Sequence, residues 1–137
     1  TVVIGNASIT SIGGQVGWST LSDRRLKNHI QENRLGLEFI NRLKTVSYTY
    51  KDKGQKGIRY SGLIAQEVES IIDNMGFEFS GVVRPTNKQS YYSLRYSEFV
   101  IPLIKAVQEQ SDEIKTLNER ISDLEKKMEA LINQQSK

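Results

Sequence analysis

Two side chains suited to nucleophilic chemistry stand close together in LSDRRLKNH, residues 21–29. A serine hydroxyl such as that of Ser22 is a poor nucleophile until a base takes its proton. Lys27 can be that base only while its amine is neutral, a state that burial or neighbouring positive charge favours. Arg24 and Arg25 supply such charge if they lie close in space. The segment therefore contains the residue types of a serine–lysine dyad.

The spacing of these two residues does not by itself support a dyad. A separation of five residues places two side chains about 140° apart around a helix, or on opposite faces of a strand. Ser22 and Lys27 meet only if the segment bends, or if the partner comes from another chain. A solvated basic turn, or a helix start capped by Ser22 or Asp23, explains the same residues.

An abrupt change in charge marks this segment. Residues 1–21 carry no formal charge, whereas Ser22 is followed at once by Asp23, Arg24, Arg25 and Lys27. The uncharged part contains the β-branched stretches TVVI and ASITSI, punctuated by glycines, which predict short β segments. So short a piece cannot bury a core alone, and we expect it to end a larger β structure or to pack on other copies.

The middle of the chain predicts a small α+β domain. Hydrophobic spacing, alternation and turn residues predict the following elements: a helix in 34–43, a strand in 45–51, a turn in 51–57, a strand leading into a helix over 59–73, and a hairpin over 78–94 with its turn at 85–88.

From about Tyr96 onward the pattern predicts one long helix that begins near Pro102. Its heptad a and d positions are apolar except for Gln110, and they comprise Val107, Ile114, Leu117, Ile121, Leu124, Met128 and Leu131. This narrow stripe with charged flanks predicts a self-associating coiled coil. Isoleucine at a with leucine at d favours two strands. Arg120 at g and Glu125 at e instead favour a parallel trimer, in which the arginine covers the core edge and pairs with the next chain. The alternative is a surface ion pair that adds little.

Composition excludes several classes of function. The 137 residues allow one modest domain with an appendage, and no apolar run is long enough to span a membrane. The chain has no cysteine and one histidine, so we expect no metal and no cofactor.

Nucleic-acid binding is a disfavoured alternative. It would use Arg24, Arg25, Lys27 and the lysines of YKDKGQKGIRY beside Tyr48, Tyr50 and Tyr60, but 16 acidic residues nearly balance 19 basic ones. GQKG at residues 54–57 lacks the spacing of a phosphate loop, although a nucleotide could still regulate the protein without that motif.

Three motifs carry a resemblance to a known family. SDRRLK at residues 22–27, GLIAQEV at 62–68 and LIKAVQE at 103–109 precede the predicted coiled coil. Together, over about residues 20–125, they resemble the C-terminal intramolecular chaperones, the S74 self-cleaving peptidase domains. These domains end phage tailspikes, endosialidases, L-shaped tail fibres and neck appendages, and a related domain occurs in a membrane-bound animal transcription factor. The β stretch before residue 22 fits a phage fibre or spike.

The resemblance implies an organisation in three parts. Residues 1–21 would end the β-rich stalk of the mature fibre, 22–106 would form the chaperone and self-cleaving domain, and 107–137 would form the trimeric coiled coil. The resemblance implies a homotrimer whose folding client is its own stalk. It would act in the host cytoplasm during phage assembly as a virion-associated precursor, and it would be released after cleavage.

The resemblance also implies an enzymatic role. The domain would be a serine endopeptidase that cuts its own chain once, in cis, at Leu21–Ser22. Ser22 would be the nucleophile and Lys27 the general base, with Asp23 and Arg24 in support. The alternative is a trimerisation module of a structural fibre protein that does not cleave.

Overall fold

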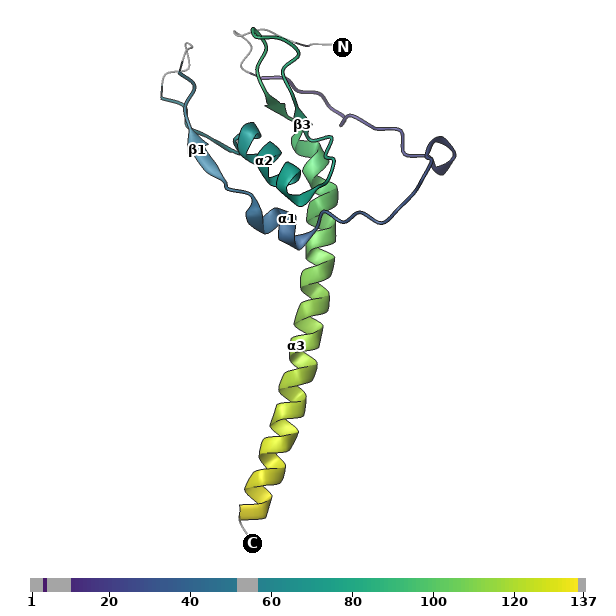
Figure 1. The fold of residues 1–137 in the computed structure, drawn as a ribbon, viewed down its shortest axis with the longest axis vertical. Coiled ribbons are helices and arrows are strands. Elements are labelled where there is room, and N and C mark those ends of the chain that lie inside the picture. Colours follow the sequence, from purple (N-terminus) through teal and green to yellow (C-terminus); the bar gives the residue numbers. More distant parts are fainter. Residues whose placement is uncertain (1–3, 5–10, 52–56, 136–137) are drawn as a thin grey trace. The chain divides into compact units, whose positions relative to one another are not determined.

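The computed structural model describes residues 4, 11–51 and 57–135. The chain divides into two units that alternate along the sequence, and Figure 1 shows their elements. The first unit comprises Thr1–Glu32 and Thr45–Gly62, and the second comprises Asn33–Lys44 and Leu63–Lys137.

The first unit contains one turn of 3-10 helix and one strand pair. The turn, η1, spans Arg24–Leu26, and strands β1 (Val46–Tyr48) and β2 (Tyr60–Gly62) pair antiparallel. The rings of Tyr48 and Tyr60 stack with their centroids 6.0 Å apart, and Tyr50 meets Tyr60 edge-on at 5.3 Å. These tyrosines therefore pack on one another. Both predicted strands are confirmed, whereas most of the turn predicted between them lies outside the described residues.

The predicted β segments before Ser22 fall almost wholly outside the described residues. Residues 11–21 are described, and they form neither helix nor strand and are exposed throughout. A strand needs a neighbour to satisfy its backbone N–H and C=O groups. The β stalk end at residues 1–21 and the boundaries after residues 21 and 106 stay predictions.

The second unit confirms the predicted small mixed domain followed by a long helix. Its elements, in chain order, are α1 (Leu37–Arg42), α2 (Ala65–Met75), β3 (Val82–Val83), β4 (Ser93–Leu94), η2 (Tyr96–Phe99) and α3 (Val100–Gln135). Strands β3 and β4 pair antiparallel and form the predicted hairpin. Helix α2 ends at Gly76, whose left-handed φ of 69° favours glycine.

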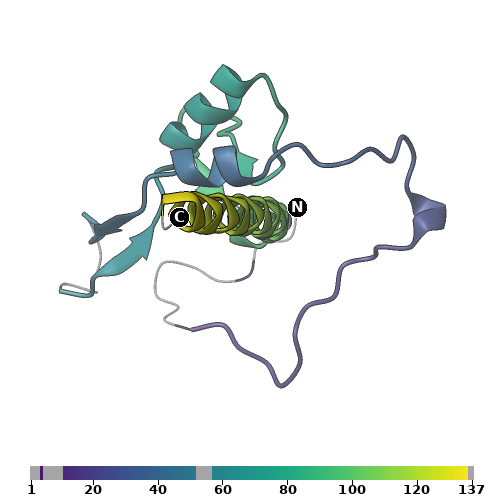
Figure 2. The same cartoon turned by 90° about the horizontal axis from the view of Figure 1, so that it is seen from below.

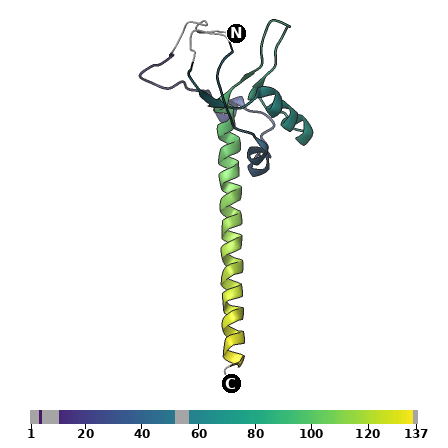
Figure 3. The same cartoon turned by 90° about the vertical axis from the view of Figure 1, so that its left-hand side faces the viewer.

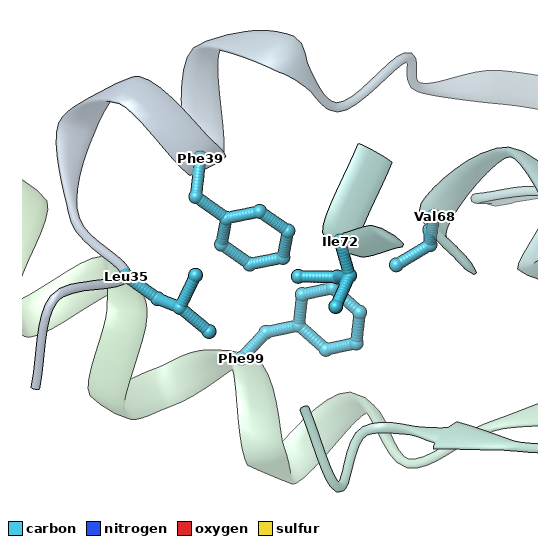
Figure 4. Packing of buried hydrophobic residues seen from close by; sticks show 5 residues of the cluster. All are labelled: Leu35, Phe39, Val68, Ile72 and Phe99. Atoms are coloured by element: carbon cyan, nitrogen blue, oxygen red, sulfur yellow. The ribbon is translucent and has the colours of Figure 1, made fainter. Parts of the chain in front are cut away.

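A small apolar core holds α1, α2 and the start of α3 together. Figure 4 shows its buried members, which are Leu35, Phe39, Val68, Ile72 and Phe99. Phe39 is fully buried, and its ring centroid lies 5.3 Å from that of Phe79 and 6.2 Å from that of Phe99. Aromatic side chains bury a large apolar area each, so Phe39 and Phe99 contribute much of the stability of this small core.

Glu109 of α3 caps the N-terminus of α1. Its Oε2 atom accepts a hydrogen bond of 2.7 Å from the backbone N–H of Leu37, which is 72 residues away. The preceding residue, Gly36, offers no side chain as a cap. A Cβ atom at Gly36 would lie 2.7 Å from the Glu109 carboxyl carbon, so only glycine leaves room for this contact. The negative charge also suits the positive end of a helix.

A polar cluster fastens the hairpin to α2. Glu69 accepts hydrogen bonds from the Arg84 guanidinium and, at 2.8 Å, from the Tyr92 hydroxyl. The pKa of Glu69 is lowered by the hydrogen bond from Arg84 first and by that from Tyr92 second. The two residues flank the hairpin turn, so this single carboxylate holds both of its ends.

Helix α3 continues far beyond the core of its unit (Figures 1 and 3). From Gln110 to Gln134 every side chain of the helix is exposed. Viewed along α3, helices α1 and α2 lie on one side of it (Figure 2). The helix therefore contributes to the core over its first turns only.

Replacement of the central aromatic residue tests this core. Phe39→Ala should lower the free energy of unfolding by about 3–5 kcal/mol, because it leaves a cavity among Leu35, Phe79 and Phe99. Tyr91→Ala is the control, since Tyr91 is 90% exposed and its loss should change stability by no more than about 0.5 kcal/mol. Urea unfolding followed by circular dichroism measures both; equal effects would contradict the assigned core.

Candidate active site

The segment from Ser22 to Lys27 bends through η1. Asp23 is the N-cap: its Oδ1 atom accepts a hydrogen bond of 2.8 Å from the backbone N–H of Arg25. Two further backbone bonds close the turn, from Leu26 N–H to the Asp23 carbonyl and from Lys27 N–H to the Arg24 carbonyl, both 3.1 Å. Of the two caps considered from the sequence, Asp23 is the one used.

This bend brings Ser22 and Lys27 together. The Nζ atom of Lys27 donates a hydrogen bond of 2.7 Å to the Oγ atom of Ser22. A regular helix or strand would hold these side chains apart, whereas the tighter turn lets the lysine stem fold back. The contact forms within one chain, so no partner is needed for the two groups to meet.

Arg25 clamps the capping carboxylate. Its Nε and Nη2 atoms donate to the Oδ1 and Oδ2 atoms of Asp23 at 3.1 and 2.7 Å, a bidentate arrangement. The side-chain hydrogen bond from Arg25, followed by its backbone N–H, lowers the pKa of Asp23 below its ordinary value. The cap therefore stays ionised at neutral pH.

The sequence pattern did not predict this role of Arg25. The spacing could have indicated it, since an arginine two residues after a capping aspartate can donate hydrogen bonds to its carboxylate. Arg24, the residue predicted to support the site, contributes its backbone carbonyl to the turn, and its side chain forms no ion pair within the described part of the chain.

The whole site is exposed in the single chain. Leu21 is 86% exposed, and every residue from Ser22 to Ile30 is exposed as well. A neutral lysine is favoured by a dry environment, which this chain does not supply around Lys27. Ser22 and Lys27 are thus in contact, but the single chain does not bury them.

The residues expected in the coiled coil form an open stripe along α3. Ile114, Leu117, Ile121, Leu124, Met128 and Leu131 are between 47% and 61% exposed. Arg120 and Glu125 lie beside them, and neither forms an ion pair among residues 11–51 and 57–135. Such a contiguous apolar stripe is typical of a surface that meets another protein.

No group of three or more His, Cys, Asp or Glu side chains in the described part of the chain could hold a metal ion. Among the same residues, no helix combines the length and the apolar character that crossing a bilayer requires.

Comparison with known proteins identifies the domain. Residues 22–77 match the Peptidase_S74 family, described as the chaperone of endosialidase. The matched segment begins at Ser22 and includes the capped turn, α1 and α2. The match covers less than half of the chain. It confirms the resemblance found in the motifs, and it indicates a domain of the endosialidase-chaperone type over these residues.

The S74 match leaves the rest of the chain unassigned. It ends at Phe77, so the β3–β4 hairpin and α3 lie outside it. No curated protein matches the chain at a significant level. The family implies possible self-cleaving peptidase activity, and the first residue of the match is Ser22.

Titration of Asp23 tests the clamp. In Arg25→Ala the pKa of the Asp23 carboxyl should rise toward its ordinary value, because the ionised form loses the hydrogen bonds from the guanidinium and keeps only that from the backbone N–H. Arg24→Ala should leave that pKa unchanged. Carbon-13 NMR of the Asp23 carboxyl group measures both values; an unchanged pKa in Arg25→Ala would contradict the clamp. Since the folded pKa is lowered, the cap should be lost only as pH falls through that value.

Proposed function

We propose that this protein is a trimeric intramolecular chaperone that releases itself by cutting the Leu21–Ser22 bond. The observation that carries the proposal is the contact of 2.7 Å between Lys27 Nζ and Ser22 Oγ, at the first residue of an S74 domain. The change from an uncharged to a charged sequence falls on the same bond. Three independent features thus support cleavage at this position.

The proposed reaction uses groups of the capped turn. Neutral Lys27 takes the hydroxyl proton while Ser22 Oγ attacks the carbonyl carbon of Leu21. The bond from that carbon to the Ser22 nitrogen breaks, and Lys27 returns the proton to the leaving amine. The resulting ester links Leu21 to Ser22 Oγ, and water opens it to a Leu21 carboxylate and a free Ser22 hydroxyl. Each chain cuts itself once.

Asp23 and Arg25 take positioning roles in this reaction. The carboxylate caps the turn and the guanidinium fixes the carboxylate, so together they keep the lysine stem folded over Ser22. Neither group touches the reacting carbonyl. Small losses of alignment between a nucleophile and its base are costly in rate.

The proposed trimer forms through α3. Its exposed heptad stripe would be buried against two other copies, with Arg120 and Glu125 pairing between neighbours. Local helical contacts form quickly, whereas strands shared between chains form slowly. A coiled coil that brings three chains into register would therefore raise the effective concentration of stalk strands. Cleavage would then remove the assembly device and trap the folded stalk kinetically.

The alternative function is a trimerisation module that does not cleave. The exposure of Ser22 and Lys27 favours it, because the single chain does not dry the lysine. The same exposure fits a dyad that becomes active only when assembly covers it. The two functions differ in whether the bond before Ser22 breaks.

Variants of the dyad decide between these functions. Ser22→Ala should leave the 137-residue chain intact, and Lys27→Ala should slow cleavage by about 10²–10⁴-fold, the usual contribution of a general base. Arg24→Ala serves as the control and should be cut at close to the normal rate. Intact-mass spectrometry follows the cleavage products. Sedimentation should show that all variants stay trimeric. Normal cutting of Lys27→Ala would remove its assigned role.

Loss of the stripe should separate the chains. Ile121→Ser combined with Leu124→Ser removes apolar side chains that each contribute about 1.5–3 kcal/mol when buried, so the trimer should dissociate. Lys126→Ser combined with Glu129→Ser changes neighbouring residues off the stripe and should leave a trimer of three 15.6 kDa chains. Analytical ultracentrifugation measures both. A trimer that survives the first pair would place the interface elsewhere.

A further inference from the structure

Phe99 at the end of η2 and the first turns of α3 together carry apolar side chains on two sides. One side belongs to the core of the second unit: Phe99, Pro102 and Ala106 are buried there. The other side is exposed to between 46% and 64%, and it consists of Val100, Ile101, Leu103, Ile104 and Val107. Three of these exposed residues continue the heptad stripe, since Val100 and Val107 take position a and Leu103 takes position d.

Ile101 and Ile104 lie outside that stripe, at positions b and e. They are 56% and 50% exposed, and their spacing of three residues places them on one face of the helix. The next residues at position b are Gln108 and Lys115, and those at e are Ser111 and Asn118. Over the three heptads from residue 107 to residue 127, positions b and e are polar, and the next apolar residue at either position is Ile132. We name Ile101 and Ile104 the flank patch.

In each copy, the core of the second unit packs on the flank of α3 that lies opposite the flank patch. Phe99 and Ala106, at position g, face that core, and Glu109, at position c, caps α1. Figure 2 shows α1 and α2 on one side of α3. In a parallel coiled coil, position g of one helix faces position e of the next. The globular part carried at g of one copy therefore comes next to the flank patch of its neighbour.

We infer that the second unit of a neighbouring copy covers the flank patch. The inference rests on the proposed trimer and extends it: the contact between copies includes their globular parts and does not end at the coiled coil. The segment that ends at Glu32 joins the second unit at Asn33. If a neighbouring copy holds the second unit in place, this end of the segment is held as well. The trimer thereby links assembly to the segment that contains Ser22.

Single cysteines can test this cover, because the chain has no cysteine of its own. Ile101→Cys and Ile104→Cys place a thiol in the flank patch. Lys115→Cys and Asn118→Cys are matched controls, at the same two heptad positions two heptads further on. Each purified variant is treated with a small maleimide and its labelling rate is measured by mass spectrometry, after sedimentation has established its oligomeric state.

In the trimer, thiols at positions 101 and 104 should label at least about tenfold slower than those at 115 and 118, because labelling then needs local opening. In the background of Ile121→Ser with Leu124→Ser, which should be monomeric, all four should label at similar rates. Equal rates in a proven trimer would overturn the inference and leave the trimer standing. Slow labelling in the monomer would show that the chain covers its own patch, which also overturns it. A wild-type chain that sediments as a monomer would refute the trimer itself.

Discussion

The Asp23 carboxylate holds the turn on which the proposed chemistry depends. It accepts hydrogen bonds from the backbone N–H and from the guanidinium of Arg25. The turn that results lets Lys27 reach Ser22 across a separation that a regular helix or strand would not bridge. The acidic residue directly after Ser22 thus has a structural role: it caps the turn that brings the proposed nucleophile and the proposed base into contact.

Geometry alone does not activate a lysine base. The dyad is exposed in the single chain, whereas a neutral amine is favoured by a dry site. In the proposed account, assembly supplies that environment, so cleavage waits until three chains have come together. This order would favour folding of the stalk, since cleavage before assembly would remove the chaperone while the stalk was still unfolded. The start of α3 suits this coupling, because one side of the helix packs in the core of its own chain and the other side would contact the neighbouring copies of the proposed trimer.

Sequence patterns predicted most elements because those patterns are local. The alternation in TVSYTYK, the apolar spacing around Phe39 and the heptads after Val107 each correspond to an observed strand or helix. The bend at Ser22 was left open, because η1 depends on a side-chain cap that regular periodicities do not describe. The bond from Leu37 to Glu109 was missed for a different reason: it joins residues 72 positions apart, and nothing local pairs them. The β segments predicted in residues 1–21 lie mostly outside the described residues and stay a prediction.

Native mass spectrometry of the purified chain over time can show whether cutting depends on assembly. We expect trimers of the 15.6 kDa chain to convert to assemblies whose chains begin at Ser22, and dilution to monomers to stop the conversion. Stable trimers that never lose residues 1–21, or monomers that cut as fast as trimers, would contradict this dependence.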